Sequence, residues 1–219
     1  MAAQTIWYYT GLPKKVVDSI EEDLENNFDS ELQDSIVGHN PQGEQSGGNE
    51  LNKNIRNAKN TWVPTSHWLG GFCWHYVNRS NNENFLYDLN HIDNESLQYT
   101  VYYEGHYYNW HTDAGLDSHY TPLPNFESSA NTIQQVGEDH VRKKTEKVRK
   151  LSFSLLLSDP DTYQGGNLEL KEDNGKTYIA PRQRGTIILF DSRALHRVTK
   201  VTKGVRKSVV GWTVGPRWK

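Results

Sequence analysis

Apolar residues recur at helical spacing near the start of the chain. Val16, Val17, Ile20, Leu24 and Phe28 are three or four residues apart for most of the run that follows Pro13, a residue that suits a first helical turn. This pattern predicts an amphipathic helix. A second helix is expected over residues 66–79, although Gly70 and Gly71 weaken it. Before both helices, the aromatic run over residues 6–9 predicts a short strand.

From Phe85 onward the pattern is typical of short strands. The segments are aromatic and β-branched, and turn-forming residues separate them. They cover residues 85–92, 97–103, 106–110, 151–157, 167–171, 177–180, 186–190, 196–201 and 206–214. Asn174-Gly175 lies between two alternating runs and predicts a hairpin. Because no helices alternate with these strands, we expect a mainly β protein, an antiparallel sandwich or barrel with N-terminal helices packed on one side.

Two polar segments interrupt these patterns. Residues 38–50 are rich in Gly, Asn and Gln and predict a loop, and residues 114–145 predict an irregular surface insertion. Either segment is placed to shape the entry of a substrate. We expect a single domain over residues 1–219, with residues 1–84 as N-terminal support and substrate loops and residues 85–219 as the core.

The composition narrows the functional classes. A formal net charge of -3 gives no strong attraction to nucleic acid or membranes. The single cysteine, Cys73, excludes an intrachain disulfide and fits a reducing compartment. No apolar run approaches the length of a membrane span, and the first residues lack the regions of a signal peptide. These features predict a cytoplasmic protein without a membrane partner.

Two histidines and one aspartate form a candidate metal site. His111 and Asp113 are two residues apart at the end of a predicted strand, so both side chains emerge on one face. That pair alone is common by chance, but His196 follows another apolar strand and supplies a third donor. Two imidazoles and one carboxylate suit Fe(II) and leave coordination positions open, although Mn, Co, Ni or Zn would bind the same donors.

Arg206 lies ten residues after His196 in the sequence. Alternation in the last strand puts Arg206, Ser208, Val210 and Trp212 on one face, which we expect to be interior. A buried arginine carries a high desolvation cost unless an anion pairs with it, and a carboxylate is the natural partner. The opposite orientation would bury Lys207 beside two valines. The pattern therefore predicts a small dicarboxylate beside the metal.

This array of residues resembles that of the 2-oxoglutarate- and Fe(II)-dependent dioxygenases of the prolyl 4-hydroxylase type, and most closely the PKHD-type hydroxylases. The similarity runs over about residues 85–214. It is carried by YYEGHYYNWH (102–111), LSFSLLLSDPDTYQGGNLEL (151–170) and GTIILFDSRALHRVTKVTKGVR (185–206). The resemblance implies a double-stranded β-helix (jelly-roll) core. It also implies Fe(II) and 2-oxoglutarate as cofactors and allows ascorbate as a further one.

The resemblance assigns roles to individual residues. Tyr102 is similar to the tyrosine whose hydroxyl contacts 2-oxoglutarate, and Arg206 matches the basic residue that pairs with its distal carboxylate. Trp212 matches an aromatic position near the iron, and Tyr108 resembles another tyrosine of the pocket. Residues 56–62 (RNAKNTW) resemble a segment that contacts the substrate in prolyl hydroxylases.

The expected reaction is hydroxylation of a C–H bond by O2, with release of succinate and CO2. A peptide or protein substrate, and a peptidyl proline in particular, is the leading candidate by analogy with these families. One alternative is an oxygenase directed at nucleic acid through the basic run 142–150, although Glu146 interrupts that run. The other is a cupin-like metal-binding module without redox chemistry, and Arg206 counts against it.

Overall fold

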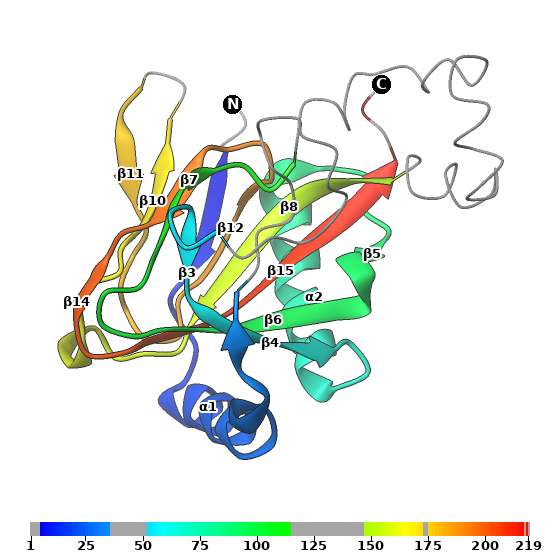
Figure 1. Ribbon diagram of the computed structural model, residues 1–219. Coiled ribbons are helices and arrows are strands. Elements are labelled where there is room, and N and C mark those ends of the chain that lie inside the picture. Colours follow the sequence, from blue (N-terminus) through cyan, green and yellow to red (C-terminus); the bar gives the residue numbers. More distant parts are fainter. Residues whose placement is uncertain (1–4, 36–51, 115–146, 173–174, 217, 219) are drawn as a thin grey trace, which may run out of the picture.

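The computed structural model of the protein describes residues 5–35, 52–114, 147–172, 175–216 and 218, and its strands form two main sheets (Figure 1). The predicted loop at 38–50 and nearly all of the predicted insertion at 114–145 lie outside these residues. Asn174 of the predicted hairpin also lies outside them, although the two strands that it separates do pair.

The larger sheet has eight antiparallel strands. Their order is β1 (Ile6–Tyr9), β12 (Ile187–Asp191), β8 (Lys147–Leu156), β15 (Arg206–Pro216), β6 (Ser96–Tyr102), β4 (Lys59–Pro64) and β2 (Gln33–Asp34), with β5 (His91–Ile92) paired to β15. The smaller sheet has five strands, in the order β11 (Thr177–Ile179), β10 (Leu168–Lys171), β13 (His196–Val198), β7 (Tyr107–His111) and β3 (Arg56–Asn57). A separate ribbon pairs β14 (Val201–Lys203) with β9 (Gln164–Gly165).

The chain alternates between the two sheets. It passes from β6 in the larger sheet to β7 in the smaller, from β8 to β10, and from β12 to β13 before it returns along β15. This alternation is the double-stranded β-helix, and it confirms the expected fold class. Strands from the N-terminal part, β1 and β3, extend one sheet each.

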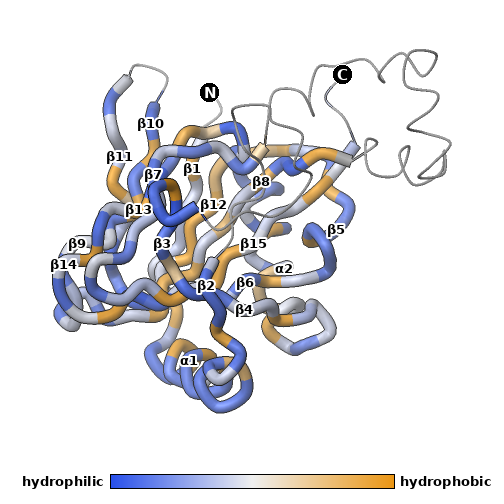
Figure 2. Tube along the Cα trace, in the orientation of Figure 1, coloured by the Kyte–Doolittle hydropathy of each residue, from blue (hydrophilic) through white to orange (hydrophobic). Residues whose placement is uncertain are grey.

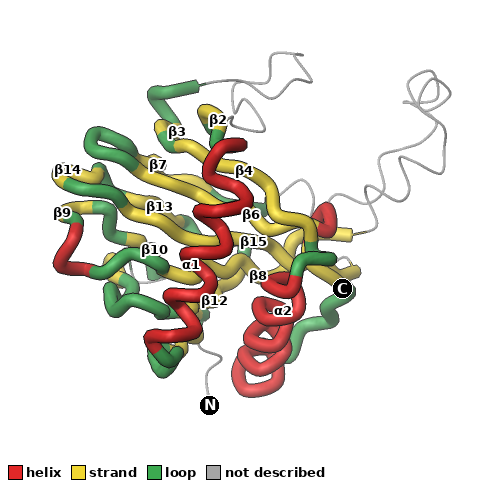
Figure 3. The backbone as a smooth tube through the Cα atoms, turned by 90° about the horizontal axis from the view of Figure 1, so that it is seen from below, coloured by secondary structure: helices red, strands yellow, loops and turns green. Residues whose placement is uncertain are grey.

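Both long helices cover the same face of the larger sheet, as Figure 3 shows: α1 (Lys14–Phe28) and α2 (Trp68–Ser80). Along α1, polar and apolar positions alternate (Figure 2), and Val17, Ile20 and Leu24 are fully buried against the sheet. Each such side chain contributes about 1.5–3 kcal/mol to stability. Short helical turns complete the chain at Asp29–Glu31, Asn81–Phe85, Asp93–Glu95 and Pro160–Thr162.

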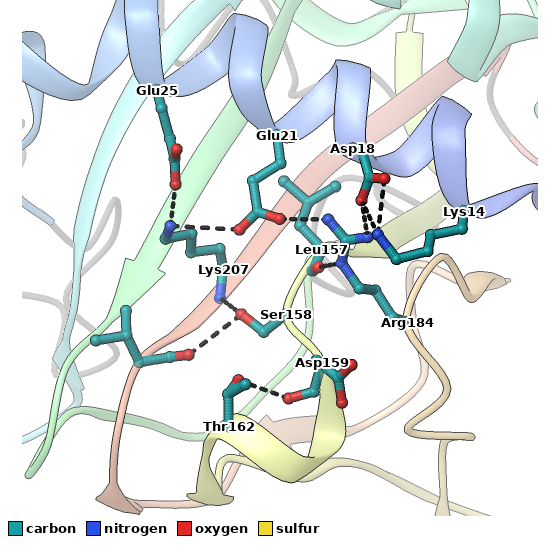
Figure 4. A network of polar contacts seen from close by, with 11 residues as sticks. Lys14, Asp18, Glu21, Glu25, Leu157, Ser158, Asp159, Thr162, Arg184 and Lys207 are labelled. Atoms are coloured by element: carbon teal, nitrogen blue, oxygen red, sulfur yellow. Dashed lines mark hydrogen bonds and ion pairs between the residues drawn. The ribbon is translucent and has the colours of Figure 1, made fainter.

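Ion pairs hold α1 to the larger sheet (Figure 4). Lys207 of β15 contacts Glu21, at 3.3 Å, and Glu25. Arg184 pairs with Asp18 and Glu21 and donates to the carbonyl oxygen of Leu157. The outward face of β15 is therefore attached to the helix through charged groups.

Two of the predicted strands differ from the observed elements. The strand predicted over 85–92 is wrong, because α2 continues as a π-helical turn to Phe85 and Leu86 then adopts a left-handed backbone conformation. Only His91–Ile92 are extended there. The strand predicted over 196–201 is two strands, since β13 joins the smaller sheet and β14 joins the ribbon.

Candidate metal centre and its pocket

The smaller sheet brings the two candidate histidines together. His111 at the end of β7 lies directly opposite His196 at the start of β13, and their ring centroids are 4.1 Å apart. Asp113 follows β7 by two residues, and its backbone N–H donates to the carbonyl oxygen of Ser192 at 2.9 Å. One antiparallel pair of strands thus positions all three side chains.

The donor atoms of the three residues converge. The Nε2 atom of His196 is 3.3 Å from one carboxylate oxygen of Asp113, and that of His111 is 3.8 Å from the other. All three donor atoms lie within 4.8 Å of one another. The geometry fits a divalent cation with two nitrogen ligands and one oxygen ligand.

Hydrogen bonds fix the orientation of both rings. The Nδ1 atom of His111 bonds the carbonyl oxygen of Asn109 at 2.7 Å, and that of His196 bonds the carbonyl oxygen of Ala194 at 2.9 Å. A proton on each Nδ1 leaves each Nε2 lone pair directed at the centre. This is the usual arrangement of a metal-binding histidine.

The charges of the three groups are coupled. Burial, and after it the nearby His196, lower the pKa of His111 to about 3, so His111 is neutral at neutral pH. Burial also favours a lower pKa for His196, but the carboxylate of Asp113 outweighs it and the pKa is raised. Burial alone would raise the pKa of Asp113, but the two imidazoles and a hydrogen bond from Ser152 hold it below its usual range. The site therefore keeps a carboxylate charge that a cation would neutralise.

The three residues lie on the wall of a pocket of 410 Å³ between the two sheets. Arg206, Ser208, Val210 and Trp212 all line it, which is the alternation expected for the last strand. Lys207 points the other way, toward α1. Arg206 is 4% exposed, donates to Ser208 Oγ at 3.0 Å and lies over the Tyr102 ring at 5.5 Å. Among the described residues, no carboxylate contacts it.

Tyr108 also lines the pocket and contacts the metal centre through its ring. It stacks on the His111 imidazole, with ring centroids 3.5 Å apart and an angle of 14° between the planes. Its other contact is Arg56, whose guanidinium carbon lies 4.7 Å from the Tyr108 ring centre. The structure therefore places every predicted site residue around one pocket. Their roles stay predictions.

Sequence reasoning missed three polar residues of this pocket. Ser152 donates to Asp113 Oδ2 at 2.7 Å, and Gln98 accepts a hydrogen bond from Arg56 at 2.7 Å. Arg149 enters the pocket because the pairing of β8 with β15 shifts there: Thr213 lies opposite Leu151, but Val214 lies opposite Arg149. Such a bulge reverses the alternation, and no sequence signal marks it.

The comparison with protein families shows to which family the chain belongs. Residues 97–214, more than half of the chain, match the model of the 2OG-Fe(II) oxygenase superfamily. The chain belongs to this superfamily. The matched region contains the two histidines, the aspartate and Arg206.

Curated relatives of this oxygenase are PKHD-type hydroxylases. One from Parvibaculum lavamentivorans is 44% identical over 62 residues, which is 28% of each chain. Another from a Shewanella species is 36% identical over 95 residues, or 42% of each chain. The chain thus matches less than half of the length of these relatives.

Solved structures support the fold of the oxygenase. A prolyl-4-hydroxylase from Pseudomonas putida has a TM-score of 0.64 at 16% identity, and the match covers 100% of this chain and 95% of that one. A prolyl hydroxylase from Trichoplax adhaerens, in complex with a peptide fragment of hypoxia inducible factor, has a TM-score of 0.65 at 15% identity, over 95% and 83% of the chains. None of the described helices of this oxygenase has the length and apolar character needed to cross a membrane.

The residues present fit the cofactors that the superfamily name implies. The donor set of two nitrogens and one oxygen suits Fe(II), and both imidazole tautomers are fixed for metal binding. The buried guanidinium of Arg206 suits the carboxylate of 2-oxoglutarate.

Proposed function

We propose that this oxygenase hydroxylates a peptidyl proline, with His111, Asp113 and His196 as iron ligands. The overall reaction converts R–H, O2 and 2-oxoglutarate into R–OH, succinate and CO2. The observation that carries the proposal is that the three donor atoms lie within 4.8 Å of one another on the wall of a pocket that also holds the buried Arg206.

The protein residues hold the metal and keep its ligands in the right form. Iron, when bound, supplies the activation of O2 and the coupled oxidative decarboxylation of 2-oxoglutarate. His111 and His196 offer Nε2 because their Nδ1 protons are held by backbone carbonyls. Asp113 offers Oδ1, while Ser152 holds its Oδ2. Three protein ligands on one side leave the other side for cosubstrate and O2.

Arg206 and Tyr102 bind the distal carboxylate of 2-oxoglutarate in this proposal. They lie opposite each other on β15 and β6, and both are at least 95% buried. A guanidinium in so dry a place binds a carboxylate strongly and holds the cosubstrate in one orientation. Ser208 orients the guanidinium by accepting its hydrogen bond.

The substrate enters past aromatic side chains in this proposal. Trp62 and Trp212 line the pocket with ring centroids 6.3 Å apart, and Trp62 is 49% exposed. Such surfaces suit extended, proline-rich peptides. The prolyl hydroxylase folds of the solved structures support a proline substrate, and ascorbate is proposed as an auxiliary cofactor on the same analogy.

An anaerobic titration with Fe(II) and 2-oxoglutarate tests the cofactor assignment. The wild type is expected to develop a visible charge-transfer band, and Asp113→Ala is expected to lack it. Arg206→Gln should raise the half-saturating concentration of 2-oxoglutarate by roughly tenfold to a hundredfold. Arg197→Gln is the matched control, because Arg197 pairs with Glu169 and does not line the pocket.

Proline-rich peptides incubated with the iron-loaded protein, O2 and 2-oxoglutarate test the substrate. The expected result is a mass gain of one oxygen atom on proline together with stoichiometric succinate. Full turnover by Asp113→Ala would refute the metal assignment, and oxidation of another residue type would refute the proline assignment.

A further inference from the structure

A second arginine of the pocket is buried without an acidic partner. Arg56 is 7% exposed, and its Nη2 donates to the neutral amide oxygen of Gln98 at 2.7 Å. Its Nε is buried without a hydrogen bond, and its guanidinium lies over the Tyr108 ring. Within the described part of the chain, no carboxylate lies within ion-pair distance of it.

Two other arginines near the pocket have the acidic partner that Arg56 lacks. Arg149, which also lines the pocket, forms an ion pair with Asp93 at 2.7 Å. Arg197, outside the pocket, lies over Trp110 as Arg56 lies over Tyr108, but it pairs with Glu169 at 2.8 Å. A buried guanidinium with only a neutral partner retains most of its desolvation cost, and an anion in the pocket would offset it.

Arg56 is distinct from the arginine assigned to 2-oxoglutarate. Arg206 bonds Ser208, and Ser208 lies opposite Thr100 on the neighbouring strand. Thr100 in turn donates to the amide oxygen of Gln98, the atom that also binds Arg56. Two hydroxyl side chains and one amide therefore stand between the two guanidinium groups.

Arg56 also lies on the side of the pocket that faces the metal centre. The Tyr108 ring that it covers is the ring that stacks on His111. An anion bound to Arg56 would thus share the pocket with the metal centre, and a pocket of 410 Å³ has room for a second small group beside a five-carbon dicarboxylate.

We propose that Arg56 binds a carboxylate of the prime substrate, so that the molecule oxidised carries a carboxylate next to the reacting C–H bond. This inference rests on the proposed function and adds a substrate class to it. The carboxylate has two sources in a peptide: an acidic side chain beside the proline, or a free C-terminus. The planar fork of Arg56, already held by Gln98 and Tyr108, suits bidentate recognition of either one.

Calorimetric binding of four short proline peptides tests the proposal. They carry Asp or Asn beside the proline, each with a free or an amidated C-terminus, and they are titrated into protein loaded with Mn(II) and 2-oxoglutarate without O2. We expect the peptide with the right carboxylate to bind roughly tenfold to a hundredfold more tightly than its amide counterpart. A preference for Asp over Asn would identify an acidic side chain as the source of the carboxylate. A preference for the free over the amidated C-terminus would identify the C-terminal carboxylate.

Variants of Arg56 separate recognition from structure. Arg56→Gln should bind acid and amide peptides equally, and Arg56→Lys should keep part of the preference. Arg197→Gln should keep all of it. Thermal unfolding of each variant establishes that it is folded, and the 2-oxoglutarate affinity of Arg56→Gln should equal that of the wild type.

Three outcomes would overturn the carboxylate assignment. One is the absence of any carboxylate preference in the wild type, whether all four peptides bind equally or none binds. Another is an unchanged preference in Arg56→Gln. The third is a loss of 2-oxoglutarate affinity in Arg56→Gln as large as that in Arg206→Gln, which would make Arg56 part of the cosubstrate site. Failure of the proposed function differs, since the wild type itself would then fail to bind 2-oxoglutarate, or would fail to oxidise proline in the acid and amide peptides alike.

Discussion

His111 and His196 lie directly opposite each other across the antiparallel pair of β7 and β13. The candidate metal centre is therefore set by strand register. A shift of one residue would turn one histidine to the far face of the sheet. Asp113 is fixed to the same pair, because its backbone N–H bonds the loop that leads into β13.

Replacement of Asp113 by Ala should abolish metal binding. The carboxylate is the only negatively charged donor of the three, and without it the two remaining imidazole ligands supply no charge to neutralise the cation. We expect the dissociation constant for Mn(II), measured by electron paramagnetic resonance, to rise at least about a hundredfold. His75→Ala, on the exposed face of α2, should bind Mn(II) as the wild type does. Equal Mn(II) binding by the two variants would contradict the assignment of Asp113 as a metal ligand.

Replacement of Ser152 by Ala should weaken metal binding without removing a ligand. Its hydroxyl donates to Asp113 Oδ2 at 2.7 Å and fixes the carboxylate. Loss of such a supporting contact typically costs about tenfold to a hundredfold in metal affinity. Ser154→Ala is the matched control, because Ser154 lies two residues along β8 and has no contact with the aspartate. An unchanged Mn(II) affinity in Ser152→Ala would show that the hydroxyl does not orient Asp113.

Replacement of Gly166 by Ala should raise the requirement for 2-oxoglutarate. Gly166 has φ +61°, and a Cβ there would lie 3.0 Å from Cδ of Arg206. Gly175 has φ +80°, but a Cβ there would meet nothing within 4 Å. Both substitutions should lower stability by about 1 kcal/mol through backbone strain. Only Gly166→Ala should also displace Arg206 and weaken 2-oxoglutarate binding in the anaerobic titration. Equal affinity in the two variants would contradict this contact.

Replacement of Lys150 by Met should stabilise the protein at neutral pH. Burial, with Arg193 nearby, lowers the pKa of Lys150 from 10.5 to about 8. Because the folded pKa lies below the unfolded value, the folded state is penalised while the amine is charged, and the penalty is relieved as pH rises from about 8 to 10.5. The contact of the Lys150 amine with the Trp218 ring offsets part of this penalty.

We therefore expect Lys150→Met to gain about 1–2 kcal/mol at pH 7 in urea unfolding, and the gain to shrink as pH rises from about 8 to 10.5. The comparison of the two proteins at each pH removes the contribution of every other titrating group. If the gain in unfolding free energy did not depend on pH, packing of the Met side chain would be its cause. A loss of stability at pH 7 would show that the contact of Lys150 with Trp218 outweighs the cost of burying the charge.

The sequence predicted the parts of the site that follow a regular pattern. Alternation in the last strand correctly places Arg206 and Trp212 in the pocket, and the two-residue spacing brings His111 and Asp113 to one face. Arg149 was missed because a bulge reverses the alternation of β8. Arg56 lies in a strand of two residues, too short for any periodicity, so its burial depends on tertiary contacts alone.

The fold was predictable to a similar extent. Long strands and the two helices follow from periodicity, whereas β2, β3 and β4 were not predicted. β2 and β3 have only two residues each, and in β4 the polar residues Asn60 and Thr61 are buried by pairing and not by an apolar pattern. The error at 85–92 has a local cause, since Phe85 ends a π-helical turn that continues α2.

Arg206 and Lys207 are neighbours in the chain and face opposite sides of β15, one into the pocket and one toward α1. Genetic selection for altered cosubstrate affinity should therefore recover substitutions outside the pocket, at Glu21 and Glu25. The effect of a charge reversal at either glutamate on cosubstrate affinity would be suppressed when position 207 is also changed to an acidic residue. Compensating substitutions at position 207 and at Glu21 or Glu25, all outside the pocket, would thus reflect the need to keep Arg206 in place inside it.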